Sequence, residues 1–188
     1  MRLERALHVY AEPRVQQLVQ GAPGAIGTVG VAYLTLHLSV TAALLLWLHR
    51  RRPAAYPIVR TTLIAASTLS LIAFLAFPTA PPRLAGTGLV DTVSRGSVDL
   101  DRGLVSALYN RYAAVPSLHA GYALLVGAAL VRYGRARLLR AVGAIYPPFV
   151  LLAVVATGNH FFLDAAIGGL VAAGSVAVAL ALVGRGVG

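Results

Sequence analysis

Five long apolar segments, separated by polar loops, constrain the fold of this 188-residue chain more than any other feature. The segments cover roughly residues 27–48, 58–77, 117–133, 138–157 and 160–183. A helix needs about 20 predominantly apolar residues to cross the hydrocarbon core of a bilayer, and only the third segment is clearly shorter. Hydrophobic residues make up 58% of the chain and charged residues 12%, which is too apolar for a water-soluble globule. We therefore predict an all-α fold, a polytopic transmembrane helical bundle of about five spans.

The first 26 residues differ from the rest of the chain. The stretch "MRLERALHVYAEPRVQQLVQ" carries charges throughout and lacks the continuous apolar core of a signal peptide. We predict an amphipathic helix that lies on the membrane and is broken near Pro13. The chain then divides into an N-terminal interfacial helix, residues 1–26, and a membrane-embedded catalytic helical domain, residues 27–188. If residues 1–20 crossed the membrane, they would add a sixth span and put the N-terminus on the other side, while the orientation of the remaining segments would not change.

The charge of the chain is strongly basic and unevenly placed. All 16 basic residues are arginine and the net charge is +10, a balance that would also suit nucleic-acid binding. The arginines, however, cluster between the apolar segments, as residues that set membrane topology do, and there they can meet anionic lipid head groups. We therefore expect the membrane as a partner and no nucleic acid. The lack of cysteine excludes disulfides and thiolate metal sites.

The distribution of arginine also predicts the orientation of the segments. The loop after the first segment carries arginines at positions 50–52, and the loop after the third carries Arg135 and Arg137, with no acid in either. Short, purely basic loops are cytoplasmic under the positive-inside rule. The N-terminus is then outside and the C-terminus inside. The long outer loop, residues 78–116, faces the non-cytoplasmic side of the plasma membrane.

In this orientation, separate parts of the chain bring unusual polar residues to one face of the membrane. These residues are Arg83, His119, His160 and Asp164. His160 and Asp164 are four apart and share a helix face, so the carboxylate can orient the imidazole and leave its other nitrogen as a nucleophile or base. His119 can donate a proton and Arg83 can grip an anion, while two helix N-termini favour phosphate. The pattern predicts phosphoryl transfer on a lipid, without a cofactor.

Three stretches carry a resemblance to a known family. "PSLH", "HFFLD" and the earlier "FPTAPPRL" resemble motifs of the type-2 phosphatidic acid phosphatase superfamily, over about residues 74–170. The resemblance implies that His160 is the nucleophile and forms a phosphohistidine, and that Asp164 orients it. It implies that His119 protonates the leaving group, and that Ser117 and Arg83 contact phosphate.

The sequence departs from the superfamily pattern at several positions. The first motif lacks its lysine, Leu118 replaces the glycine of the PSGH motif, and Ala153 and Val154 stand where the SR pair would lie. These departures resemble the inositol phosphorylceramide synthase branch, an inositolphosphotransferase-like group. Arg111 or Arg102 are candidates to replace the missing arginine.

Several alternatives remain open at this point. The substrate could be a phospholipid or a prenyl phosphate. Water as acceptor would make the chain a lipid phosphatase, whereas a lipid hydroxyl would make it a transferase that passes a phosphorylated alcohol such as phosphoinositol between lipids. Two histidines and a carboxylate could instead hold a metal, although the arginine and helix N-termini disfavour a cation, so we expect no metal. A non-enzymatic transporter with a histidine relay is a third reading. The oligomeric state stays open.

Overall fold

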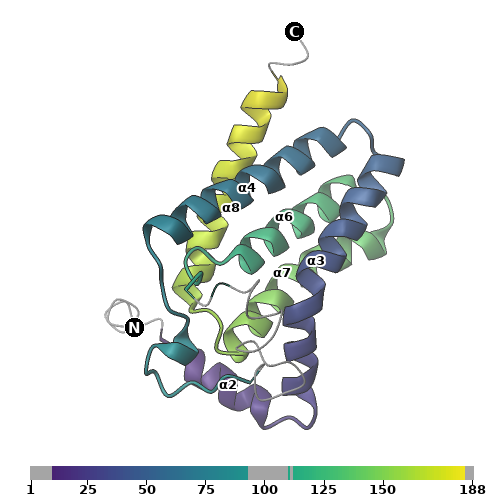
Figure 1. Ribbon diagram of the computed structural model, residues 1–188. Helices are drawn as coiled ribbons and strands as arrows, with labels where there is room; N and C mark the ends of the chain where they lie inside the picture. Colours follow the sequence, from purple (N-terminus) through teal and green to yellow (C-terminus); the bar gives the residue numbers. More distant parts are fainter. Residues whose placement is uncertain (1–9, 93–109, 111, 185–188) are drawn as a thin grey trace.

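The computed structural model describes residues 10–92, 110 and 112–184, and these form an all-helical bundle (Figure 1). The α-helices of this part are α2 (Glu12–Gln20), α3 (Ala25–Arg51), α4 (Tyr56–Ala76), α6 (Leu118–Tyr133), α7 (Arg137–Ala156) and α8 (Phe162–Gly184). A short 3-10 turn, η1 (Pro82–Leu84), follows α4. The predicted all-α class is confirmed.

Four of the helices, α3, α4, α7 and α8, are long and apolar enough to cross a membrane. The predicted third span is the exception. It forms α6, which has 16 residues and is therefore about 24 Å long, less than the roughly 30 Å of a hydrocarbon core. The described part of the chain thus holds four long candidate spans and the shorter apolar helix α6, which packs against α3, α4, α7 and α8.

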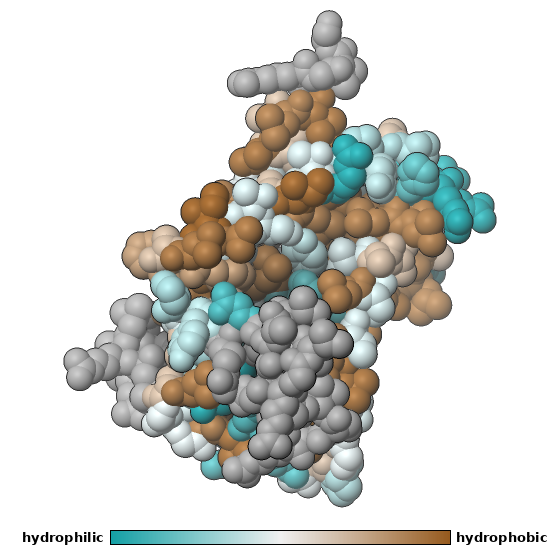
Figure 2. Space-filling view, in the orientation of Figure 1, coloured by the Kyte–Doolittle hydropathy of each residue, from teal (hydrophilic) through white to brown (hydrophobic). Residues whose placement is uncertain are grey.

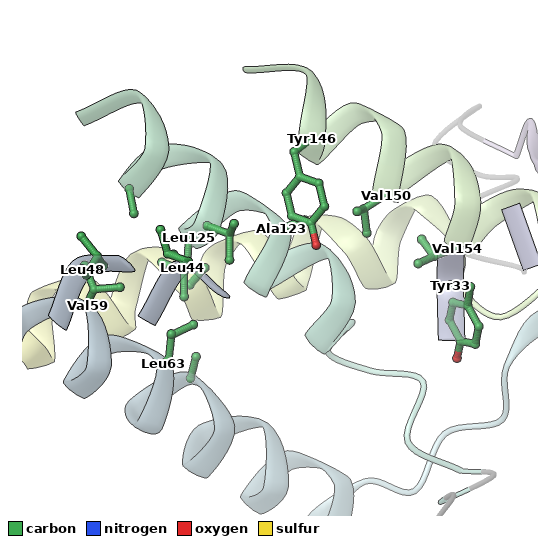
Figure 3. Close-up of a cluster of buried hydrophobic side chains, with 14 of the residues drawn as sticks. Tyr33, Leu44, Leu48, Val59, Leu63, Ala123, Leu125, Tyr146, Val150 and Val154 are labelled. Carbon is green, nitrogen blue, oxygen red and sulfur yellow. The ribbon is translucent and has the colours of Figure 1, made fainter. Parts of the chain in front are cut away.

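The surface of the bundle is apolar, as expected for contact with lipid. Leu38, Leu75 and Leu170 are 70%, 74% and 72% exposed, and Figure 2 shows hydrophobic surface along the long helices. Leucine side chains at such exposure are unfavourable in water and neutral in hydrocarbon. A continuous core lies inside, where Leu48 and Val154 are fully buried (Figure 3). These features identify a membrane protein.

Glycines set how closely the helices of the bundle approach one another. A Cβ added to Gly127 of α6 would lie 2.5 Å from the carbonyl oxygen of Gly143 in α7. A Cβ on Gly121 of α6 would lie 2.9 Å from the carbonyl oxygen of Gly168 in α8. Small residues allow backbones to touch in this way. The contact with Gly168 brings the first turn of α6 against the first turns of α8.

Helix α2 does not stand apart from the bundle. It packs against α7 and α3, and Pro13 lies in its first turn. The residues that it buries are polar, Glu12 and Gln16, whereas Gln17 and Leu18 are exposed. A helix therefore exists over Glu12–Gln20, and its inward side combines Glu12 and Gln16 with the half-buried Val15 and Val19. That this segment lies on the membrane stays a prediction, and residues 1–9 lie outside the described part.

The two arginine-rich loops lie at one end of the bundle (Figure 1). Arg52, at the end of α3, donates a hydrogen bond from Nε to the carbonyl oxygen of Tyr133, the last residue of α6, at 3.2 Å. The connections that carry η1 and the starts of α6 and α8 lie at the other end. The bundle therefore has a basic end and a second end where the candidate site residues gather.

Candidate active site

Backbone hydrogen bonds join the connecting segments at the second end of the bundle. Thr79 N donates to the Tyr112 carbonyl at 2.7 Å, and Ala114 N donates to the Thr79 carbonyl at 3.2 Å. Ser117 N donates to the carbonyl of Asp164 at 3.0 Å. Segments far apart in the sequence are thus fastened to one another, and they form a frame for the side chains between them.

His160 lies in the tight connection between α7 and α8. Helix α7 ends at Ala156, and Gly158, shortly after it, has a φ of 71°, the left-handed conformation that favours glycine after a helix. The buried ring of His160 places Nδ1 3.0 Å from the carbonyl oxygen of Ala114. A carbonyl can only accept, so Nδ1 carries the hydrogen, and in the neutral ring Nε2 holds a lone pair. Among the described residues no hydrogen-bond partner is found for Nε2.

Asp164 lies beside His160 but is hydrogen-bonded elsewhere. Its Oδ2 is 3.6 Å from His160 Nδ1, which is too long for a hydrogen bond. The same oxygen accepts a hydrogen bond from the backbone N–H of Phe161 at 2.8 Å. The carboxylate therefore caps the start of α8 and acts on the His160 ring through its charge, whereas the spacing predicted a direct hydrogen bond.

His119 is held in the first turn of α6 by rings from α3. Its ring stacks on Tyr33 with centroids 4.5 Å apart and lies 4.5 Å from His37. The centroids of His119 and His160 are 6.0 Å apart. The two predicted histidines are therefore neighbours, close enough to reach the same phosphoester.

A pocket of about 170 Å³ opens beside the two histidines. The described residues that line it are Tyr33, Phe74, Pro81, Asn110, Ala113, Ala114, Leu118, His119, Asn159 and His160. Apolar groups form most of the wall, and its polar residues include the two histidines and two asparagines. Such a pocket can accept a small polar group attached to an apolar chain.

The predicted anion-binding residues lie next to this pocket but not in its described lining. The Arg83 side chain is fully buried and donates from Nε to Asn159 Oδ1 at 3.1 Å, and its Nη1 pairs with Asp91 at 3.2 Å. Ser117 is the N-cap of α6, because its hydroxyl accepts from Ala120 N at 3.3 Å. Arg111 and Arg102 lie outside the described residues.

Sequence analysis missed three lining or neighbouring residues. Asn159 bridges Arg83 to Thr157 Oγ1, to which its Nδ2 donates at 2.9 Å. Tyr33 and His37 sit one turn apart on α3 and were not assigned to the site. The signal was available for His37, because an ionisable residue inside an apolar segment is costly and usually functional.

Within residues 10–92, 110 and 112–184, no three His, Asp or Glu side chains lie close enough to hold a metal ion. The candidate catalytic histidines, His119 and His160, are accompanied by Asp164, by His37 and by the ion pair of Arg83 with Asp91.

A helical membrane bundle with two adjacent histidines beside a partly apolar pocket defines a class of integral membrane protein with a histidine-based site. The sequence matches the PAP2 superfamily over residues 1–179, and the chain belongs to that superfamily. Comparison with curated proteins and with solved structures gave no significant match. Membership supports a phosphatase-type or phosphotransferase-type function on lipids, and it confirms the superfamily to which the motifs pointed.

Proposed function

We propose that the chain is a metal-independent lipid phosphatase or phosphotransferase that cleaves a lipid phosphoester through a phosphohistidine on His160. The observation that carries the proposal is the pairing of two histidines beside one pocket. Nδ1 of His160 lies 3.0 Å from the Ala114 carbonyl oxygen, and the centroids of the His119 and His160 rings are 6.0 Å apart. One nitrogen is thereby available to attack phosphorus, while a second imidazole is near the leaving oxygen.

In the first step, Nε2 of His160 attacks phosphorus and the bond from phosphorus to the lipid oxygen breaks. His119 gives its proton to that oxygen, and the lipid leaves as an alcohol. The ring of His160 then carries the phosphoryl group on Nε2 and keeps its hydrogen on Nδ1. The Ala114 carbonyl and the Asp164 charge both stabilise this positively charged ring.

In the second step, an acceptor hydroxyl attacks the phosphohistidine and passes its proton to His119. The N–P bond breaks and His160 returns to its starting state. Water as the acceptor releases phosphate, whereas a lipid alcohol receives the phosphoryl group. Transfer of phosphoinositol would follow the same two steps with a phosphodiester, as the resemblance to the inositol phosphorylceramide synthase branch suggests.

The substrate class follows from the position of the pocket in an apolar bundle. A phospholipid or a prenyl phosphate can keep its chain in the bilayer while its phosphate enters the pocket. Arg83 contributes positive charge next to the pocket, because it is hydrogen-bonded to Asn159, which lines the pocket. Ser117 caps the start of α6. The pocket lies at the end of the bundle opposite the basic end. Because the positive-inside rule puts the basic end in the cytoplasm, we expect the pocket to face the non-cytoplasmic side of the plasma membrane.

The covalent intermediate is the most direct test of the proposal. Purified protein is incubated with lipid phosphates labelled at phosphorus, and the chain is examined for acid-labile, base-stable label at His160. Substitution His160→Ala is expected to abolish both label and turnover. Substitution His119→Ala is expected to slow both steps by about 100-fold or more.

A matched control is available at the basic end of the bundle. His49 is exposed near the end of α3, so His49→Ala should label and turn over like the unchanged protein. Full activity in His160→Ala would refute the proposal. Reactions with and without an added lipid alcohol, analysed for free phosphate and for new phospholipid, identify the acceptor.

A further inference from the structure

Helix α2 buries two polar side chains against the backbone that carries the candidate site. Glu12 is fully buried, and its Oε1 accepts a hydrogen bond from the backbone N–H of Phe162, the first residue of α8, at 3.0 Å. Phe162 is two residues after His160. A carboxylate at a helix N-terminus satisfies a free N–H group and complements the positive end of the helix dipole.

The other oxygen of Glu12 makes this contact unusual. Oε2 is buried and has no hydrogen-bond partner among the described residues. Burying a carboxylate oxygen in this state costs free energy. The hydrogen bond from Phe162 N must offset that cost, and it is the contact that accounts for the buried position of the Glu12 carboxyl group.

Gln16, one turn further along α2, joins two other segments. Its Nε2 donates to the carbonyl of Val90 at 2.9 Å and to the carbonyl of Ala156 at 3.0 Å. Its Oε1 accepts from Val90 N at 2.9 Å. Val90 precedes Asp91, the partner of Arg83, and Ala156 ends α7, so one amide ties both segments to α2.

From these contacts we infer that Glu12 and Gln16 are positioning residues for the reaction, and that α2 holds the His160 connection between α7 and α8. The inference rests on the proposed function. Glu12 fixes the connection at its α8 end and Gln16 fixes it at its α7 end. The ring of His160, between those two fixed points, is thereby kept at the Ala114 carbonyl.

Paired variants test the role of each side chain. Glu12→Ala removes the acceptor for Phe162 N, and it should lower kcat by up to about 100-fold with little change in KM, because the nucleophile is misplaced rather than lost. Glu12→Gln keeps an acceptor oxygen and should restore most of kcat. Gln16→Ala should lower kcat in the same way, whereas Gln17→Ala, on the exposed face of the same helix, should leave it unchanged.

Hydrogen exchange gives a readout that does not depend on activity. In Glu12→Ala, amide exchange should rise in a peptide covering residues 157–164 and stay unchanged in peptides from α3 and α4. This local pattern supports the inference, and unchanged exchange in residues 157–164 overturns it. Equal kcat per folded molecule in Glu12→Ala and the unchanged protein also overturns it.

The two proposals fail in different ways. If the unchanged protein processes no lipid phosphate and takes no label on His160, the proposed function is wrong. The exchange pattern in Glu12→Ala and Gln16→Ala then decides alone whether α2 holds the connection.

Discussion

The ring of His160 is oriented mainly by a backbone carbonyl, that of Ala114 at 3.0 Å from Nδ1. The carboxylate of Asp164 is further away, at 3.6 Å, and is engaged by the Phe161 N–H. Two functions are therefore combined in one aspartate. It caps α8 through a hydrogen bond, and it supplies negative charge beside a ring that becomes positive during the reaction.

Substitutions at Asp164 separate these two functions. Asp164→Asn keeps an oxygen for the Phe161 N–H but removes the charge, so it should lower kcat while leaving thermal stability nearly unchanged. Asp164→Ala should lower kcat and also cost about 1 kcal/mol of stability through the lost cap. Turnover and thermal unfolding are measured on both variants. Equal stability of the two variants would argue against the capping role.

The sequence was sufficient to predict which side chains meet at the site, but not which backbone groups orient them. The spacing of His160 and Asp164 predicted that the two side chains lie close together, and topology placed His119 at the same end. The shared helix face was wrong, because α8 begins at Phe162 and His160 lies in the connection before it. The Ala114 carbonyl could not be foreseen, because every residue has a carbonyl and no sequence pattern marks the one that will face a ring. Arg83 was expected at phosphate, but its contacts with Asn159 and Asp91 depend on a loop conformation that hydropathy does not encode.

At the scale of elements, α3 is part of the site. Tyr33 and His37 lie one turn apart and face the ring of His119, and His37 also stacks on Tyr122 with centroids 4.7 Å apart. Four aromatic or imidazole rings from α3 and α6 are thus in contact. Such contacts limit the orientations that the His119 ring can adopt.

Removal of the His37 ring should therefore reduce activity. His37→Ala is expected to cost about 1 kcal/mol of transition-state stabilisation, or about fivefold in kcat, through the lost ring contacts. His37→Phe keeps a ring and should retain more activity than His37→Ala. Steady-state kinetics on both variants check this order. An equal loss in the two variants would mean that an imidazole nitrogen, rather than ring packing, is what His119 needs.

The approach of α6 to α8 depends on glycine. A Cβ on Gly168 would clash with the backbone of Ser117, whereas a Cβ on Gly174, further along the same helix, meets nothing within 4 Å. Gly168→Ala should cost about 1–3 kcal/mol through overpacking and lower activity by moving the first turn of α6. Gly174→Ala should be neutral in both. Thermal unfolding and turnover in detergent or nanodiscs make the comparison.

The existence of the long helices could be predicted because hydropathy reflects burial in lipid. The burial of Glu12 and Gln16 on the inward side of α2 could not, since hydropathy records composition and says nothing about which partner a face meets. The short α6 was recognised from its length. Its place among the other helices follows from Gly121, Gly127, Gly143 and Gly168, whose role requires the facing backbone to be known.

At the scale of the whole molecule, the two ends of the bundle differ, because the arginine-rich turns lie at one end and the candidate site lies at the other. The turns after α3 and α6 carry arginines, and the hydrogen bond from Arg52 to Tyr133 joins these turns. The two histidines of the site lie at the other end. Orientation in the membrane therefore decides which compartment the pocket opens to.

The lack of cysteine in the chain makes this orientation easy to measure. Single cysteines are introduced at Tyr112, which is 55% exposed near the pocket, and at Arg135, in the turn between α6 and α7. A membrane-impermeant maleimide added to intact cells should label Tyr112→Cys. It should label Arg135→Cys only after permeabilisation. The opposite pattern would reverse the proposed orientation.

The short length of α6 bears on how the acceptor reaches phosphorus. If Arg132 of its last turn lies at one interface, its first turn lies about 6 Å below the other, because about 24 Å of helix faces about 30 Å of hydrocarbon. A phosphate that meets the histidines must sink below the head groups of neighbouring lipids. At that depth less water than at the surface is expected, which would favour an alcohol that reaches the site through the leaflet over water as the acceptor.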